Sequence, residues 1–269
     1  MLQSMVAKGV SVKFKSYEET IPRVLDLIKF DVELAKQQTI ILKPSVQPDG
    51  TVTKAGLVEA VLKYCLAKKQ GPAKIFIAEG SDGASTDDMF EAAGYNRLAE
   101  QYPISFIDLN TATVEHTQNG EFLKFTSIAY PVALKEAFVI SLPAPREHPE
   151  VEYSGALANM LGAFPAKHYA GWFSTTKNKM REHPIKYAIH DIIKVKMPDA
   201  TIIDASDKGM LFVGNALEMD KQAAKLYKGD WKNVQHLRLI EESAIYHHKK
   251  AEQRAREKEL QELMPSALS

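Results

Sequence analysis

The feature that most constrains the fold is a repeated unit, in which a short apolar run is followed by a longer stretch with helical periodicity. The runs are bounded by polar residues, so each predicts a strand that is buried on both faces. Buried strands that alternate with helices predict an α/β fold, with a mostly parallel sheet and helices on both of its faces. The predicted strands are Gln38–Lys43, Lys74–Ala78, Ile104–Leu109, Ala137–Leu142 and Ala200–Ala205, with Met210–Val213 as a further candidate.

The stretches between the strands repeat apolar residues at the spacing of one helix face. Pro22 lies near the start of the first stretch, where proline fits the first turn of a helix, and Thr53 is a candidate N-cap for the next. Residues 110–133 break the alternation, and the pattern of Glu121–Ile128 indicates a hairpin or an edge strand. The predicted helices are Thr20–Lys36, Lys54–Lys69, Gly155–Leu161, Pro184–Lys196, Lys221–Lys228 and Asn233–Leu263.

The C-terminal part of the sequence predicts one long charged helix, about residues 233–263. From Lys249 to Glu262 it is charged on nearly all sides, which fits either a solvated helix or a protruding helix that pairs with another subunit of a homo-oligomer. The sequence shows no internal repeat and no low-complexity linker. We therefore expect one α/β domain over residues 1–269.

Composition argues against several classes of protein. Lys+Arg and Asp+Glu both number 34, so there is no basic surplus of the kind that nucleic-acid binding needs. No stretch approaches the roughly 18 apolar residues of a membrane span, and the first residues show no signal-peptide pattern, so we expect a cytoplasmic protein without a membrane partner. Cys65 is the single cysteine, which excludes a disulfide within the chain, and its helical setting predicts a buried apolar residue.

Ligands of open parallel sheets bind outside the carboxyl ends of the strands, so the residues after each predicted strand are candidates. The turn Glu79–Thr86 combines glycines with a following helix, as phosphate-binding loops do. It has neither the Walker lysine nor the dinucleotide fingerprint, and its aspartates would repel a phosphate, so we favour an ordinary strand–turn–helix connection. Lys43, Glu79 and Ser81 are nevertheless candidate ligand-binding residues at this edge.

The fourth predicted strand leads into the most unusual stretch of the sequence, residues 141–169. A loop of that length is uncommon in a compact domain unless it has a function. Arg146 can clamp a carboxylate or a phosphate through two parallel hydrogen bonds, and His148 and His168 are candidate acid–base catalysts. Asn159 lies among apolar residues, so its amide needs a structural partner or a ligand. Each histidine taken alone also fits a structural hydrogen bond.

Metal binding and nucleophilic catalysis have little support in the sequence. The histidines show no recognised ligand spacing such as HExxH, so we predict no metal site and name no cofactor. The alternative is a hard cation held by Asp82, or by Asp204 and Asp207, because oxygen ligands suit magnesium and calcium. There is no GxSxG elbow, and Cys65 lies within a helix rather than at its start.

Seven segments together resemble the prokaryotic family called domain of unknown function 362, over about residues 38–240. The family is often found beside ferredoxin-type cysteine motifs, looks like a distant relation of the lactate-racemase fold, and has no assigned reaction. The segments are, in order, IILKPSV (Ile40–Val46), IFIAEGS (Ile75–Ser81), AAGYNRLA (Ala92–Ala99), VISLP…H (Val139–His148), GALANMLGAFPAKHY (Gly155–Tyr169), TIIDA (Thr201–Ala205) and EMDKQAAKLY (Glu218–Tyr227).

The resemblance implies functional positions in this chain, and it adds Lys167 to the ligand-binding candidates. Where the family has LPKLKTH this sequence has LPAPREH, so Arg146 is the only cation before His148, and Ala158 replaces a family lysine. The cysteine-rich extension is missing, so we expect no iron–sulfur cluster, and a redox role would need a separate protein. The positions implied are Lys43, Glu79–Ser81, His148, Asn159–Met160, Lys167–His168 and Asp220.

Two functions follow from these expectations. The first is an enzyme that binds a small anionic metabolite, with Lys43 and Arg146 holding the charge and His148 or His168 moving protons. The second is a non-catalytic accessory module that docks with a partner, such as an iron–sulfur protein. An enzyme requires one pocket in which the candidate side chains converge, whereas a module leaves them dispersed or paired with each other. The side chains expected to converge are those of Lys43, Ser81, His148, Asn159 and Lys167.

Overall fold

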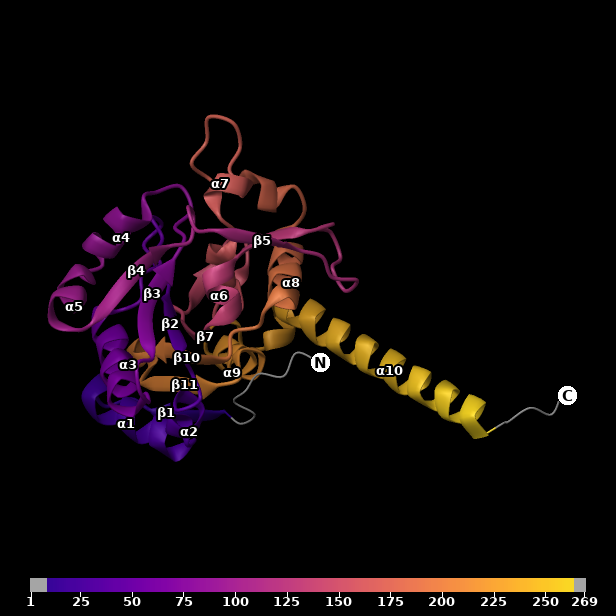
Figure 1. The fold of residues 1–269 in the computed structure, drawn as a ribbon, viewed down its shortest axis with the longest axis horizontal. Helices are drawn as coiled ribbons and strands as arrows, with labels where there is room; N and C mark the ends of the chain where they lie inside the picture. The colour runs from indigo at the N-terminus through magenta and orange to yellow at the C-terminus, as the bar shows by residue number, and fades with distance from the viewer. Residues whose placement is uncertain (1–8, 264–269) are drawn as a thin grey trace, which may run out of the picture.

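The computed structural model describes residues 9–263, and within them the main element is a seven-stranded sheet. Its strands are β1 (Val10–Lys13), β2 (Thr39–Pro44), β3 (Lys74–Glu79), β4 (Ile104–Asp108), β7 (Phe138–Leu142), β10 (Ala200–Ala205) and β11 (Met210–Gly214). Their order is β1-β11-β10-β7-β2-β3-β4, and the strands from β10 to β4 run parallel (Figure 1). Antiparallel β11 and β1 complete one edge. The predicted mostly parallel α/β sheet is confirmed.

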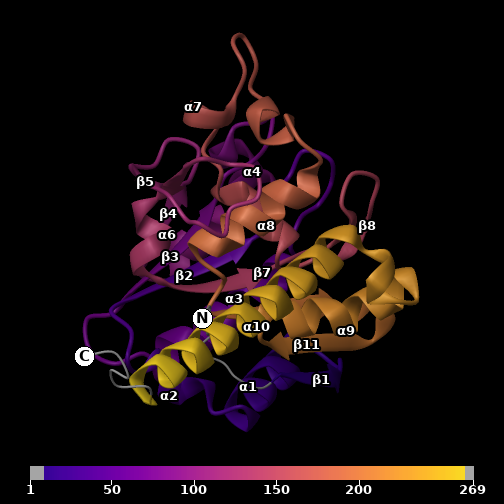
Figure 2. The same cartoon turned by 90° about the vertical axis from the view of Figure 1, so that its right-hand side faces the viewer.

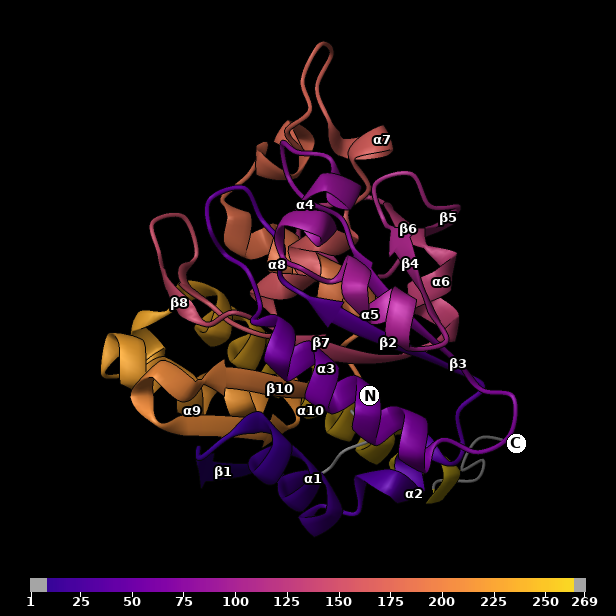
Figure 3. The same cartoon turned by 90° about the vertical axis from the view of Figure 1, so that its left-hand side faces the viewer.

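Helices cover both faces of this sheet. One face carries α1 (Tyr17–Leu27), α3 (Ala55–Lys68), α4 (Thr86–Ala92) and α5 (Asn96–Gln101), as Figure 3 shows. The opposite face carries α6 (Val132–Glu136), α8 (Ile185–Val195) and α9 (Ala216–Lys228), part of which is seen in Figure 2. Side chains of β2 alternate between two cores, with Ile40 and Leu42 on the α3 face and Ile41 on the α8 face. Cys65 is buried in the α3 core, as predicted.

The first helical stretch is interrupted, so the prediction of one helix from Thr20 to Lys36 was wrong. Lys29 adopts a left-handed conformation with φ 56°, and this break separates α1 from the short α2 (Phe30–Leu34). The predicted N-cap at Thr53 was also wrong, because α3 starts after Lys54. The hydroxyl of Thr53 instead donates to the carbonyl of Leu142 at 2.5 Å, which fastens the loop after β2 to the end of β7.

The predicted α-helix Gly155–Leu161 is replaced by a 3-10 helix, η1 (Ala158–Ala163). The reason is that its first turn is bound to another element. The carboxylate of Asp220, on α9, accepts hydrogen bonds from the backbone N–H groups of Ala156 at 2.7 Å and Leu157 at 2.9 Å. A Cβ on Gly155 would lie 2.2 Å from an oxygen of Asp220, so glycine permits this close approach.

Two small hairpins flank the sheet. The alternation of Glu121–Ile128 predicted a hairpin or an edge strand in that segment, and this placement was wrong: a hairpin is present, but its strands are β5 (Val114–Thr117) and β6 (Ile128–Pro131), and all of the alternating segment except Ile128 lies in the loop between them. Asp191, buried on α8, holds that loop by accepting from the backbone N–H groups of residues 123, 124 and 125. The hairpin of β8 (Arg146–His148) and β9 (Glu152–Ser154) was not predicted, nor was β1.

The predicted long C-terminal helix is confirmed as α10 (Gln235–Leu263). Its first turns pack against α8 and α9, where Leu237 and Ile240 are buried. His190 of α8 bonds through Nε2 to the hydroxyl of Ser243 at 2.9 Å. From residue 248 to residue 259 every side chain is exposed, and the helix projects away from the body of the protein (Figure 1). Within residues 9–263, none of the helices has the length and apolar character to cross a membrane.

Asp220 provides a test of how η1 is held. Its carboxylate is buried, and burial raises its pKa to about 7, while the two backbone donors oppose the shift. In the unfolded chain the carboxyl ionises at about pH 4. Between pH 4 and pH 7 the carboxyl is therefore protonated in the folded state and ionised in the unfolded state, so unfolding releases a proton. The contribution of this group to the free energy of unfolding thus decreases as the pH rises through that window.

We expect Asp220→Asn to lack that pH-dependent contribution. Urea denaturation of wild type and variant between pH 4 and 7 measures it, because the other carboxylates cancel in the difference. The stability of the wild type relative to the variant should decline as the pH rises. A difference that is constant or grows with pH would contradict the raised pKa.

Candidate functional site

The order of the strands reverses between β2 and β7. From β2 the chain continues to β3 and β4 on one side, and then returns to the other side of β2 as β7 and β10. In open parallel sheets such a reversal leaves a crevice at the carboxyl ends of the two strands, and ligands bind there. The topology therefore selects the segments that follow Pro44 and Leu142.

A buried ion pair lies beneath this crevice. Nζ of Lys43, the penultimate residue of β2, is 2.5 Å from Oε2 of Glu79, the last residue of β3, and both side chains are fully buried. Lys43 also donates to the backbone carbonyl of Asn159 at 2.6 Å. Burial lowers the pKa of the Lys43 amine, and the charge of Glu79 opposes that shift. One ammonium group thus joins β2, β3 and η1.

The Asn159 side chain is satisfied by the protein itself. Its amide nitrogen donates to the carbonyl of Lys43 at 2.9 Å and to the hydroxyl of Ser141 at 3.1 Å. Its amide oxygen accepts from the hydroxyl of Ser45 at 2.8 Å. The sequence left open whether this amide has a structural partner or a ligand, and the structure provides structural partners on β2 and β7.

Two glycines allow the backbone to close over the ion pair. A Cβ on Gly162 would lie 1.8 Å from Oε1 of Glu79 and 2.8 Å from Nζ of Lys43. A Cβ on Gly80 would lie 2.5 Å from the carbonyl oxygen of Gly162. Only residues without a side chain fit at either position, so the turn after β3 and η1 pack backbone to backbone and seal Lys43 from above.

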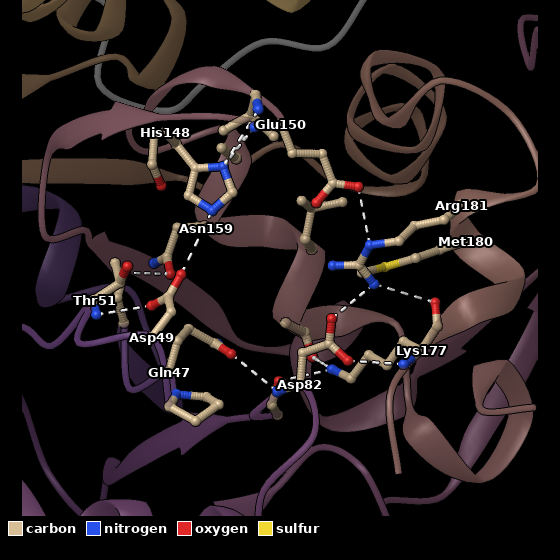
Figure 4. A pocket seen from close by; sticks show the side chains of 18 residues that line it. Gln47, Asp49, Thr51, Asp82, His148, Glu150, Asn159, Lys177, Met180 and Arg181 are labelled. Atoms are coloured by element: carbon tan, nitrogen blue, oxygen red, sulfur yellow. Dashed lines mark hydrogen bonds and ion pairs between the residues drawn. The ribbon is translucent and has the colours of Figure 1, made fainter. Parts of the chain in front are cut away.

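Above this seal lies a cavity of about 260 Å³ (Figure 4). It is formed by the loops after β2, β3 and β7, by η1 and by the segment around η2 (Asn178–Arg181). It is the crevice that the strand order predicts. Its lining is Ser45, Gln47, Pro48, Asp49, Thr51, Gly80, Asp82, His148, Glu150, Val151, Ser154, Ala158, Asn159, Leu161, Gly162, Lys177, Met180 and Arg181.

Lys177 lines the cavity and carries a buried amine. Its side chain is 1% exposed, and Nζ donates to the carbonyl of Gly80 at 2.7 Å and to that of Gly162 at 3.4 Å. Among the described residues no carboxylate forms an ion pair with it. Burial lowers its pKa to about 8, while the more distant charge of Glu79 opposes the shift. The amine therefore changes protonation state close to neutral pH.

His148 forms another part of the wall. Its Nδ1 accepts from the backbone N–H groups of Glu150 at 3.1 Å and Val151 at 3.4 Å. A nitrogen that accepts cannot carry a proton, so the proton of this imidazole is on Nε2. Nε2 lies 3.5 Å from the carboxylate of Asp49 (Figure 4). The hairpin thus holds the His148 ring so that its Nε2–H group is directed to Asp49.

Arg181 lies at the opposite wall between two carboxylates. It contacts Asp82 at 2.7 Å and Glu150 at 2.9 Å, and Asp82 also accepts from the backbone N–H of Lys177 at 2.7 Å. Burial works against the charge of the Arg181 guanidinium, but the two carboxylates outweigh it and raise the pKa. These bonds fix the segment that carries Lys177 onto the turn after β3.

The structure brings only part of the predicted site to the cavity. His148 and Asn159 line it, and Lys43 and Glu79 lie sealed beneath it. Ser81 is buried nearby, but its hydroxyl donates to the carbonyl of Val46 at 2.5 Å.

The remaining candidates lie outside the cavity. The Arg146 guanidinium pairs with Asp49 at 2.5 Å on the outer side of the wall. Lys167 and His168 lie on α7 (Ala166–Tyr169), where Lys167 is exposed and His168 stacks edge-on against His116, with ring centroids 5.9 Å apart. Partial burial lowers the pKa of His168, and nearby His116 and lysines add to the effect. The expected convergence of five side chains in one pocket is therefore incomplete.

Sequence reasoning missed Lys177 and Arg181. They lie in the segment STTKNKMR, which in the sequence looks like a solvated loop. The signal that could have found them is the absence of strand or helix periodicity from Tyr169 to His183, a stretch that is long for a simple connection. Within residues 9–263, the acidic residues and histidines form no group of three or more that could hold a metal ion.

The fold and this cavity define an α/β protein with a crevice at the switch point of a parallel sheet. The chain belongs to the family described as domain of unknown function (DUF362), whose model matches residues 40–217. No curated protein matches the sequence. Both the predicted family and its distant likeness to lactate racemase are confirmed.

Among solved structures, the fold is similar to that of the lactate racemase apoprotein from Thermoanaerobacterium thermosaccharolyticum, with a TM-score of 0.54 and 13% sequence identity. The alignment covers 84% of this chain and 58% of that chain, so this chain spans less than two thirds of that structure. At this identity the likeness shows a shared fold alone.

The contribution of the buried Lys43–Glu79 ion pair to stability can be tested by mutation. We expect Lys43→Met to lower the free energy of unfolding by about 3–5 kcal/mol, because it leaves a buried carboxylate without its partner. Lys43→Met combined with Glu79→Gln should cost less than the sum of the two single changes. Urea denaturation measures all three variants, with Lys15→Met as the control, since the exposed Lys15–Glu19 pair contributes at most about 1 kcal/mol. Additive losses would contradict a coupled pair.

Proposed function

We propose that the protein is an enzyme that binds a small anionic metabolite in the cavity between the ends of β2 and β7, and that Lys177 both holds the anion and exchanges a proton with it. The observation that carries this proposal is the buried Nζ of Lys177, which has carbonyl partners and no carboxylate partner among the described residues. The family has no assigned reaction, so the function is inferred from the residues of the site.

The other cations around the cavity are already compensated. Lys43 is paired with Glu79, Arg146 with Asp49, and Arg181 with Asp82 and Glu150. An anion that enters the cavity gains most from the ammonium group that has no such partner, because burial strengthens the attraction between the two charges. We therefore assign the binding of the anion's charge to Lys177, in place of Lys43 and Arg146.

The role of acid–base catalyst likewise passes from the histidines to Lys177. An amine with a pKa of about 8 is protonated in most molecules and deprotonated in some at neutral pH, which suits a general acid–base group. His148 has its Nδ1 occupied by backbone N–H groups, so in this conformation it acts as a hydrogen-bond donor through Nε2. We therefore assign His148 to orienting the ligand, and Lys177 to the proton transfer.

We expect inorganic phosphate and pyruvate to bind the wild-type protein at pH 7 and to bind Lys177→Met at least about 10-fold more weakly, the effect of losing one buried charge-assisted contact. Wild-type affinity should fall as the pH rises through about 8, since the ammonium form is lost above the pKa. Isothermal titration calorimetry at pH 7 and 9 measures both effects. The matched control is Lys167→Met, which removes an exposed lysine outside the cavity and should leave the affinity unchanged.

The catalytic part of the proposal has its own readout. In D₂O, wild-type protein should exchange the methyl protons of pyruvate or the Cα proton of lactate, as followed by proton NMR, and Lys177→Met should not. If anions bind through Lys177 but no proton of a bound acid exchanges, the enzyme assignment fails for these acids and the cavity is a binding site only.

The alternative function, an accessory module that docks through its C-terminal helix, has one specific observation in its favour. Residues 248–259 of α10 are exposed on all sides and lie clear of the body of the protein. A charged helix of this kind is stabilised by pairs within itself or by a partner. The sequence left two partners open, a separate protein such as an iron–sulfur protein and a second copy of the chain.

Removal of residues 248–269 tests pairing with a second copy of the chain. If α10 pairs two subunits, light scattering should report a dimer for the full chain and a monomer for the truncated one, with unchanged anion affinity. The cut lies beyond the buried residues Leu237 and Ile240, so the body should stay folded, as circular dichroism would show. A monomeric full chain would exclude pairing through α10.

A further inference from the structure

A second cavity of about 380 Å³ adjoins the first. The two cavities share Glu150, Val151 and Arg181, so one short piece of chain and one guanidinium group separate them. The lining of the second cavity is Glu150, Val151, Glu152, Arg181, Glu182, His183, Pro184, Ile185, Lys186, Gln235 and His236.

His236 is the unusual member of this lining. Its side chain is 1% exposed, and the ring donates to the backbone carbonyl of Val151. The remaining ring nitrogen, Nε2, has no hydrogen-bond partner among the described residues. Burial lowers the pKa of His236 to about 4, so the ring is neutral at pH 7 and Nε2 is an acceptor. A buried acceptor without a partner costs about 1–3 kcal/mol, which indicates a position that a ligand group can satisfy.

A strained backbone conformation close to His236 also indicates a binding site. Glu152 has φ 65°, a left-handed conformation that is unfavourable for a residue with a side chain. Its carboxylate accepts from the backbone N–H of Gln235 at 2.5 Å and from the Gln235 side chain at 2.7 Å. These bonds fix the start of α10, and His236 with it, against the wall. Strained residues of this kind cluster at binding sites.

The charged side chains that line the second cavity are largely balanced, so the cavity does not favour an ionic group of a ligand. Glu150 is paired with Arg181, and Glu152 is occupied by the start of α10. Glu182 and Lys186 remain at the rim, with one charge of each sign, beside the neutral acceptor of His236. Hydroxyl groups, which both donate and accept, match such a mixed and balanced surface better than a cation or an anion does.

We infer that the two cavities form one extended site, in which the second takes the hydroxyl-bearing part of the anionic ligand and His236 Nε2 accepts from one of its hydroxyls. The inference depends on the proposed function, because Lys177 in the first cavity holds the anionic end. The substrate class is then a small polyhydroxylated anion, such as a sugar acid or a sugar phosphate.

Paired probes test the inference by isothermal titration calorimetry. Ribose 5-phosphate is compared with inorganic phosphate, and gluconate with acetate, so that each pair differs in its hydroxylated part. We expect at least one hydroxylated probe to bind about 5- to 10-fold more tightly than its bare partner, which is the effect of a satisfied hydrogen bond. His236→Phe keeps a ring and removes the acceptor, so it should abolish that advantage and leave the affinity for the bare anion unchanged. His183→Phe, an exposed position in the same lining, is the control.

A measurement without any variant protects the test against a misfolded His236→Phe. In protein labelled with ¹⁵N-histidine, the Nε2 resonance of His236 should shift on addition of the hydroxylated probe and stay unchanged with the bare anion. If neither hydroxylated probe binds more tightly than its partner, or if the advantage survives His236→Phe and Nε2 does not shift, the second cavity has no such role. If instead Lys177→Met leaves all four affinities unchanged, the proposed function fails first.

Discussion

The site depends on one ion pair that water does not reach. Lys43 and Glu79 end two neighbouring strands, and removing both charges from water costs several kcal/mol per ion, which is recovered only with good geometry and further hydrogen bonds. Those bonds come from η1, through the carbonyl of Asn159, and the close approach requires glycine at position 162. The register of β2 against β3 and the path of η1 are therefore fixed together, and the floor of the cavity is fixed with them.

The same pair explains why two buried lysines differ in chemistry. Lys43 and Lys177 are both removed from solvent. Lys43 has a carboxylate at 2.5 Å, whereas Lys177 has only carbonyl dipoles and the more distant charge of Glu79. A carbonyl stabilises an ammonium less than a carboxylate does, so the second amine keeps a capacity for a new anionic partner. Glu79 thus neutralises one lysine and leaves the other available.

The sequence predicted the elements whose causes are local. The apolar run Ile40–Leu42 specifies a strand with two buried faces, and parallel topology directs attention to the strand ends, which located His148 and Asn159 at the cavity. It could not predict features whose causes are distant in the chain. The helix expected at Gly155–Leu161 is lost to Asp220, more than fifty positions away, and Lys177 reaches the carbonyl of Gly80 across 97 positions. No local pattern records such bonds.

The backbone of Val151 connects the two cavities. Its N–H donates to Nδ1 of His148, and its carbonyl accepts from the ring of His236. The first bond, together with the one from Glu150, places the proton of the His148 ring on Nε2. In His236, burial keeps the ring neutral, and the bond to the Val151 carbonyl takes its one proton, so Nε2 carries none. One peptide segment therefore orients both rings, with a donor nitrogen of His148 at the first cavity and an acceptor nitrogen of His236 in the wall of the second. A ligand that spans the wall would meet an arrangement already set before it binds, which lowers the entropy lost on binding.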